Sequence, residues 1–272
     1  MEVKRVESHV NFINIYHFTI YQSPDFHKHH TLIHTGRRKS VSLPRQVLYF
    51  SNTVEELNGT VSEHELTELL SKSLFLISAG TSDLYRIANI LDSPSPSPPD
   101  SETDTPYLVA SYGELIVWPL HALGARRFGI VNAPPNGCAP AVTEQSHNRP
   151  GGGCDDQMNA LTREFNDGLG SLMAGLSSSL PGLRYSVADF YGFSNATFMN
   201  PSANGFTNTD AACCKGPCNE QFGASCGNRR QYWFWDVGHT TEKAAKLAAA
   251  AFYDRERQFT TPLNFKRLMG IH

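Results

Sequence analysis

The feature that most limits what this chain can fold into is the alternation of short apolar runs with longer amphipathic segments. Apolar residues recur every three or four positions after Ser42 and again between Gln157 and Leu180, which predicts helices with one buried face. Between such segments lie SLFLIS, RRFGIV and RYSVADF, which have the length and composition of buried strands. Strands that alternate with helices imply a parallel sheet with helices on both faces, so the sequence predicts an α/β fold.

The composition and apolar pattern of the chain change at about residue 35. Residues 1–35 are predicted to be a disordered or unrelated leader, although their crowded histidines leave a metal site as an alternative. Within the leader, residues 10–21 are rich in β-branched and aromatic side chains, which favours a strand. Residues 36–272 form the predicted domain, in which the Pro- and Ser-rich stretch 93–106 is a surface loop.

Charge and hydropathy exclude several classes of partner. A net charge of −3 over 272 residues argues against a nucleic-acid partner, which would need a clustered basic face. No apolar run approaches the roughly 20 residues that cross a bilayer, so we expect no integral membrane segment. The first residues lack the continuous apolar core of a secretory signal, yet sequons at Asn58 and Asn195 fit a secreted glycoprotein.

Cysteine usage points to an oxidising compartment. An even number of cysteines gathered in loops suggests disulfides and an extracellular protein. The six are Cys138, Cys154, Cys213, Cys214, Cys218 and Cys226. We expect Cys138 to pair with Cys154, because the Pro and Gly content of the loop between them gives it no regular structure of its own. Pairing among the other four stays open, and zinc shared by Cys214 and Cys218 is the alternative, although the tight C-x2-C pairs of common zinc modules are missing.

The motif that carries chemistry is WDVGHTTEKA, in which Asp236 and His239 straddle a predicted strand-to-helix junction. At this spacing the carboxylate can accept from the imidazole Nδ1–H, which fixes the tautomer and leaves Nε2 free as a general base. Because the pair follows a strand, we expect it at the carboxyl edge of the sheet, where open α/β folds bind ligands. The alternative is structural, with Asp236 capping the helix that follows.

Several segments resemble blocks of the plant GDSL (SGNH) ester hydrolases, in the order of that family. WDVGHTTEKA resembles its W-D-x-x-H-P-T-E block, SKSLFLISAGTSDLY its G-x-N-D block, and LGARRFGIVNAPPNGCAPA its P-P-x-G-C-x-P segment. GGGCDDQMNALTREFNDGL and DFYGFSNATFMNPSANGFTNTDAACC match further segments, so the agreement runs from about Gly36 to about Asp254. The resemblance implies a flavodoxin-like three-layer α/β/α sandwich, extracellular and without a cofactor or metal, that hydrolyses small-molecule or lipid carboxylic esters through a Ser–His–Asp arrangement.

The resemblance also assigns roles to individual residues. His239 matches the catalytic base and Asp236 the carboxylate that orients it. Gly80 matches the glycine of the G-x-N-D block, and Ser82 falls where the family has an oxyanion-hole Asn, from which it departs by a shorter side chain. Thr240 replaces the proline after the family's histidine, which is a mild change because either residue can open a helix.

The nucleophile of the family is absent, because no Gly-Asp-Ser triplet occurs in the sequence. We therefore expect the first strand of the sheet to be missing: either residues 10–21 substitute for it, or the chain is an N-terminally truncated gene model or fragment. Neither Ser8 nor Ser23 lies in such a triplet, so we expect no serine-dependent activity. The alternatives are a pseudoenzyme that binds lipids or esters without turnover, and a cell-wall interaction protein.

Four neighbours of these motifs favour structural roles. Asp83 and Asp189 follow predicted strands, where an aspartate is more often a cap or turn residue than a substrate contact. Phe234 and Trp235 favour core positions over contacts with an acyl chain.

Overall fold

The computed structural model describes residues 15–19, 42–92, 104–144, 153–215, 218, 224–255 and 258–270. For residues 15–19 it describes the backbone alone. The rest of the predicted leader, including its histidines, Ser8 and Ser23, lies outside these ranges, as does most of the predicted 93–106 loop.

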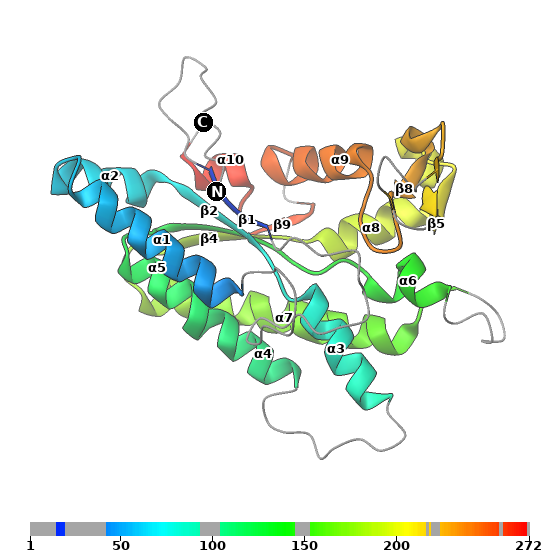
Figure 1. Ribbon diagram of the computed structural model, residues 1–272, viewed down its shortest axis with the longest axis horizontal. Coiled ribbons are helices and arrows are strands. Elements are labelled where there is room, and N and C mark those ends of the chain that lie inside the picture. The colour runs from blue at the N-terminus through cyan, green and yellow to red at the C-terminus, as the bar shows by residue number, and fades with distance from the viewer. Residues whose placement is uncertain are drawn as a thin grey trace.

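A five-stranded sheet in the order β1-β2-β3-β4-β9 forms the centre of the fold (Figure 1). β1 (Ile15–Thr19), β2 (Leu74–Ser78), β3 (Arg127–Val131) and β4 (Arg184–Ala188) run parallel, and β9 (Thr260–Thr261) pairs antiparallel with β4. The four parallel strands therefore end at one edge of the sheet, which is the edge at which open α/β folds bind ligands.

β1 comes from within the predicted leader. It pairs with β2 along its whole length, with Ile15 opposite Leu74 and Thr19 opposite Ser78. A strand from residues 10–21 thus takes the place beside β2 that a missing first strand would leave open, and it protects that edge of β2 from pairing with another chain.

The first face of the sheet is covered by helices from the first two-thirds of the chain. They are α1 (Leu43–Asn58), α2 (Glu63–Lys72), α3 (Thr81–Leu91), α4 (Thr105–Tyr112), the π-helical turn η2 (Gly113–Val117), α5 (Trp118–Ala122) and α7 (Asp156–Ser179). Phe75 and Ile77 of β2 are fully buried on this side, together with Phe50 of α1 and Phe165 of α7. Alternate residues of a strand face the same side, so the next residues along β2 must face a second layer.

That second layer contains α8 (Phe190–Met199), α9 (Glu242–Tyr253) and α10 (Phe265–Leu268); α9 and α10 lie across the sheet from α1 and α4 (Figure 1). Leu74 of β2 packs there in a core built around Trp233, which is 1% exposed. Because β2 is buried on both faces, as parallel strands usually are, the predicted three-layer α/β/α sandwich is confirmed.

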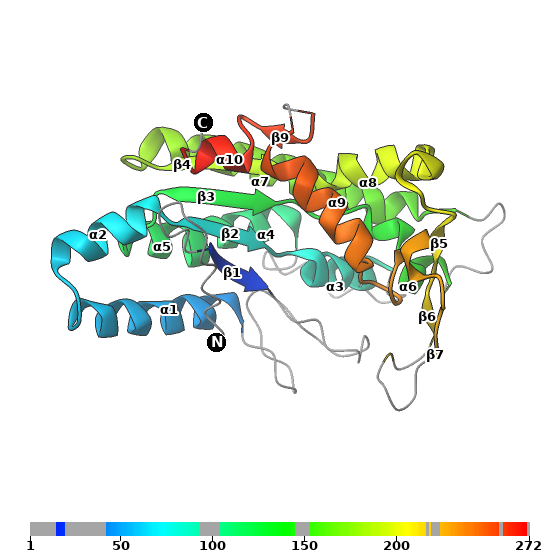
Figure 2. The same ribbon diagram turned by 90° about the horizontal axis from the view of Figure 1, so that it is seen from above.

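Short elements gather beyond the carboxyl ends of the parallel strands, beside α8 (Figures 1 and 2). They are η3 (Asn136–Cys138), α6 (Pro140–Thr143), η4 (Pro201–Asn204), β5 (Asn208–Ala212), β6 (Cys214–Lys215), β7 (Ala224–Ser225), η5 (Arg229–Gln231) and β8 (Tyr232–Phe234). β8 is not part of the central sheet, because it pairs with β5 in a separate two-stranded sheet. The strand that leads to the WDVGH motif, β8, therefore lies outside the central sheet, beyond the carboxyl ends of its parallel strands.

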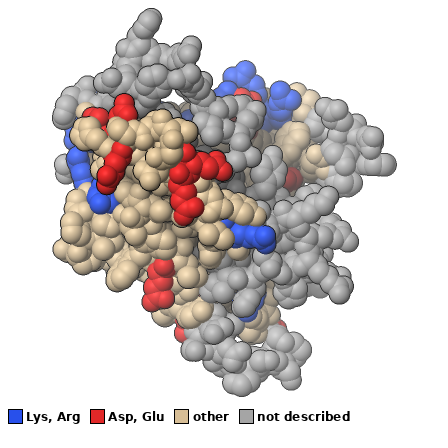
Figure 3. Space-filling model, turned by 60° about the vertical axis from the view of Figure 1, so that its left-hand side comes forward, with Lys and Arg blue, Asp and Glu red and all other residues tan. Residues whose placement is uncertain are grey.

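Among the described helices, none is both long and apolar enough to cross a membrane. On the face drawn in Figure 3, the Lys and Arg side chains of the described residues lie apart from one another rather than in one patch.

Candidate active site

Asp236 and His239 lie in the turn that joins β8 to α9. The Asp236 carboxylate reaches the imidazole Nδ1 of His239 with Oδ2 at 2.7 Å and Oδ1 at 2.9 Å. Oδ1 also accepts the backbone N–H of Gly238 at 2.9 Å and that of His239 at 2.7 Å. The expected contact is present, and the same carboxylate closes the turn and orients the ring.

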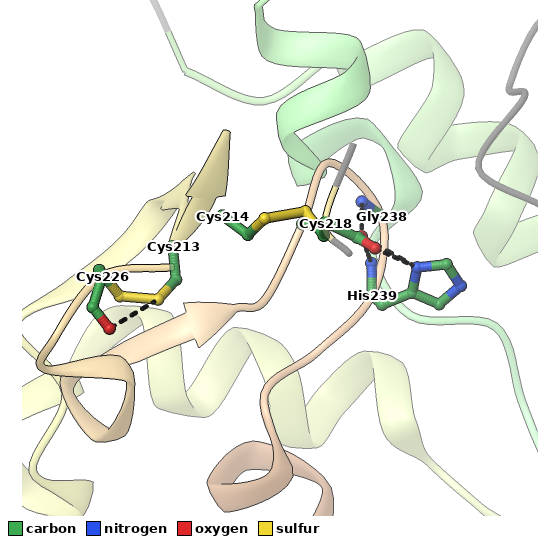
Figure 4. The surroundings of a disulfide bond; sticks show 7 residues. Cys213, Cys214, Cys218, Cys226, Gly238 and His239 are labelled. Carbon is green, nitrogen blue, oxygen red and sulfur yellow. Dashed lines mark hydrogen bonds and ion pairs between the residues drawn. A yellow bond between two sulfur atoms is a disulfide. The ribbon is translucent and has the colours of Figure 1, made fainter. Parts of the chain in front are cut away.

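The other ring nitrogen of His239, Nε2, points away from this hydrogen bond (Figure 4). Within the described part of the chain no residue hydrogen-bonds it. The His239 side chain is 43% exposed and that of Asp236 is 23% exposed, so the carboxylate is the better shielded of the two. An imidazole with one nitrogen fixed by a carboxylate and the other free can take a proton from a bound hydroxyl.

Hydrogen bonding moves the two pKa values apart. Partial burial alone would raise the pKa of Asp236, but the hydrogen bonds from the His239 ring and from two backbone N–H groups lower it below the ordinary value. The hydrogen bond to Asp236 raises the pKa of His239 against the opposing effect of burial. Both shifts favour a carboxylate beside an imidazolium, which is the state that a general base reaches after it takes a proton.

The cap of α9 is Thr241, one residue later than the sequence suggested. The Thr241 side chain accepts the backbone N–H of Ala244 at 3.3 Å and donates to the carbonyl of Tyr232 at 2.8 Å. Thr240 instead forms a backbone bridge with Phe234. The alternative in which Asp236 caps this helix is therefore wrong, because the carboxylate is used inside the turn that precedes it.

Gly80 and Ser82 lie where β2 ends and α3 begins. Gly80 has φ 110°, and a Cβ at this position would lie 2.5 Å from Cζ of the buried Phe165. Only glycine combines that backbone conformation with so close an approach. Ser82 is half-buried in the first turn of α3, at a helix N-terminus, where the helix dipole favours developing negative charge.

The loop after β3 links this part of the site to the Asp236–His239 turn. The hydroxyl of Tyr85 in α3 donates to the carbonyl of Asn136 at 3.2 Å. A few residues later, the backbone N–H of Ala141 donates to the carbonyl of Val237 at 2.8 Å. Hydrogen bonds through the loop after β3 thus connect α3 with the turn that carries Asp236 and His239.

Two asparagines of α7, whose roles the sequence left unassigned, hold this loop in place. Asn166 accepts the N–H of Ala133 and donates to its carbonyl, both at 2.9 Å. Asn159 accepts the N–H of Gly137 at 2.9 Å. A spacing of seven residues, two helical turns, places both side chains on one face of α7. That spacing was visible in the N-x6-N pattern of the resembling segment.

Two of the four neighbouring residues expected to be structural, Asp189 and Phe234, prove so. Asp189 caps α8 by accepting the N–H of Gly192 at 2.8 Å, which confirms its predicted role. Asp83 lies in the first turn of α3 and is 6% exposed. Phe234 is buried in the second core, as predicted, whereas Trp235 is half-buried.

All six cysteines are paired. The disulfides are Cys138–Cys154, Cys213–Cys226 and Cys214–Cys218. The predicted pairing of Cys138 with Cys154 is confirmed, with 4.3 Å between their Cα atoms. The zinc alternative at Cys214 and Cys218 gives way to a disulfide between the two.

Comparison with known proteins decides the family. The model of the family described as GDSL-like lipase/acylhydrolase matches residues 35–252. The chain belongs to this family. A GDSL lipase of Tanacetum cinerariifolium is 29% identical over 238 residues, covering 84% of this chain and 62% of that protein. Two proteins of Arabidopsis thaliana, each named GDSL esterase/lipase, are 31% identical and cover 77% and 85% of this chain.

Family membership confirms the resemblance that the ordered motifs suggested. The chain spans 62%, 60% and 63% of the lengths of these three relatives. The activity and substrates of a complete family protein are therefore proposed, rather than shown, for this chain.

Proposed function

We propose that this domain is that of a carboxylic ester hydrolase in which His239 is the general base and Asp236 orients it. The observation that carries the proposal is the 2.7 Å contact between Asp236 Oδ2 and His239 Nδ1, which leaves Nε2 as the nitrogen available to the hydroxyl of a nucleophilic serine. The names of the relatives, esterase and lipase, support an ester as the substrate class. Lipid, acyl and acetyl esters all fit this chemistry.

In the proposed reaction, Nε2 of His239 removes the proton of a serine hydroxyl as its oxygen attacks the ester carbonyl carbon. The negative charge that forms on the carbonyl oxygen is stabilised near the start of α3, by the backbone N–H of Gly80 and the hydroxyl of Ser82. The imidazolium then protonates the leaving alcohol, and the acyl group stays on the serine. In the second half of the reaction His239 takes a proton from water as the water oxygen attacks the acyl carbon, and it returns that proton to the serine oxygen as the carboxylic acid leaves. Loss of a single oxyanion donor costs about 10²–10³-fold in kcat, so the short side chain of Ser82 is a handicap.

We propose further that the 272-residue chain does not perform this reaction unaided, because it contains no Gly-Asp-Ser triplet to hold the nucleophile. The same observation favours a second candidate function, in which the chain binds esters without turnover. The two candidates share the site and differ only in whether a serine is held about 3 Å from Nε2.

A secreted location is part of the proposal. Three disulfides support it, because disulfides form and persist in oxidising compartments. No nucleic-acid or integral-membrane partner is proposed, and the expected partner is a small-molecule or lipid ester.

The test is a chimera in which the Gly-Asp-Ser segment of a GDSL relative precedes residues 36–272, assayed on p-nitrophenyl butyrate. We expect turnover that falls by at least about 10³-fold in His239→Ala, because a catalytic base acts as a unit with its nucleophile. His64→Ala is the matched control, since His64 is exposed on α2 at the far end of the sheet, and it should leave the rate unchanged. A chimera whose turnover survives His239→Ala would overturn the assignment.

A further inference from the structure

The turn that carries the Asp–His pair, residues 235–239 (the dyad turn), continues a backbone ladder from the cysteine-rich segment. The N–H of Cys213 donates to the carbonyl of Phe234 at 3.1 Å, and the N–H of Cys214 donates to the carbonyl of Trp235 at 2.7 Å. The last two carbonyls before the catalytic aspartate are therefore both held by adjacent cysteines.

Each of these cysteines is fixed by its own disulfide. Cys213 is bonded to Cys226, and Cys214 to Cys218, which is only four residues away in sequence. Both Cys213 and Cys214 are buried, at 5% and 1% exposure. Figure 4 shows the two disulfides in the same neighbourhood as Gly238 and the hydrogen-bonded imidazole of His239.

Apart from the backbone N–H groups of Gly238 and His239, which donate to the Asp236 side chain, the described residues give the backbone of the dyad turn two further hydrogen bonds. Within the turn, the N–H of Trp235 donates to the carbonyl of His239 at 2.7 Å. From outside, the carbonyl of Val237 accepts the N–H of Ala141, which lies three residues after the disulfide-bonded Cys138. In the described part of the chain, the backbone hydrogen bonds that reach the turn from other segments thus come from disulfide-bonded loops.

We propose that the Cys214–Cys218 disulfide is a positioning element for the Asp236–His239 pair. The disulfide holds the N–H of Cys214 against the Trp235 carbonyl and so fixes the backbone directly before Asp236, whose carboxylate binds His239. Without it, the segment can open locally without global unfolding, and the turn keeps its internal hydrogen bonds and the one from Ala141. The inference rests on the proposed function in calling the pair catalytic, but not in the contacts themselves.

A merely stabilising role would have a different signature. The entropic effect of a disulfide grows with the loop that it closes, and this loop is among the shortest possible, so its main effect should be local. The imidazole reports that local effect directly, because the pKa of His239 is raised first of all by its hydrogen bond to Asp236. Asp236 is also the charged group that acts on His239 in the described part of the chain.

The experiment is an NMR titration of the His239 ring in the full chain, comparing wild type with C214A/C218A and with C218A alone. The single variant leaves the buried Cys214 side chain in place and so guards against a folding failure of the double variant. Leu66→Ala is the control, because Leu66 is 6% exposed in the first core, on α2, away from the dyad turn. Thermal unfolding of each protein is measured alongside.

We expect the pKa of His239 to fall toward the ordinary imidazole value in both cysteine variants and to stay at the wild-type value in Leu66→Ala, whose melting temperature falls. An unchanged pKa in C218A, or an equal fall in Leu66→Ala, would overturn the proposal. Ester turnover does not enter the measurement, so failure of the proposed function would leave this result intact, and the reverse.

Discussion

Replacing Gly80 by alanine is the substitution for which the structure gives the clearest magnitude. The new Cβ would lie 2.5 Å from Cζ and 2.7 Å from Cε1 of Phe165, which is itself fully buried in the first core. The backbone at Gly80 is also left-handed, with φ 110°. The alanine therefore meets two separate penalties, one from its own backbone and one from a ring that cannot move freely.

A left-handed backbone costs a non-glycine residue about 1–2 kcal/mol, and overpacking a core costs about 1–3 kcal/mol. The smaller loss of chain entropy on folding offsets about 0.4–1 kcal/mol for alanine. We therefore expect Gly80→Ala to lower the free energy of unfolding by about 1–4.5 kcal/mol.

Urea unfolding followed by circular dichroism measures this change. Gly170→Ala is the matched control, because a Cβ at Gly170 in the interior of α7 meets no atom within 4 Å. Alanine there should raise stability by about 0.5–1 kcal/mol through its better helix propensity. If Gly80→Ala unfolds at the same urea concentration as Gly170→Ala, the reasoning about the start of α3 is refuted.

Three further predictions concern the site and the surface. Asp236→Asn should lower the pKa of His239, because the hydrogen bond to Asp236 raises that pKa above its ordinary value of 6.5. Since the pair is partly exposed, the free energy of unfolding should fall by up to about 1 kcal/mol below pH 6.5. This loss should shrink as the pH rises through the raised pKa, which unfolding at several pH values will show. Asn166→Ala removes both hydrogen bonds that hold the loop after β3, so we expect a loss of about 1–3 kcal/mol in urea unfolding, and a loss below 0.5 kcal/mol would contradict that role. After secretion from a eukaryotic host, intact mass should show a glycan that Asn58→Gln removes, since Asn58 is exposed at the end of α1, whereas Asn195 lies within α8 and should be unmodified.

Periodicity was enough to predict the elements that are long or buried. The stripe from Met158 to Leu176 gave α7, and the apolar run after Ser73 gave β2, because burial on one or both faces dictates those patterns. The dyad contact could also be predicted, since Asp236 and His239 are so close in sequence that a turn brings them together.

The parts that sequence could not give depend on contacts between distant segments. β8 looks like a core strand by composition, but its partner is β5 rather than β4, and strand order is set by tertiary packing rather than by local pattern. Pairing among Cys213, Cys214, Cys218 and Cys226 was open for the same reason, because spacing alone does not fix connectivity.

Labelling of the purified 272-residue chain with a fluorophosphonate probe tests the central claim most directly, because such probes react only with activated serines. The claim is that a base is oriented at His239 while the chain holds no Gly-Asp-Ser nucleophile for it to activate. The wild-type chain should therefore show no more labelling than His239→Ala. Stoichiometric labelling of the wild type that His239→Ala abolishes would contradict the account, since it would reveal a serine within reach of the imidazole.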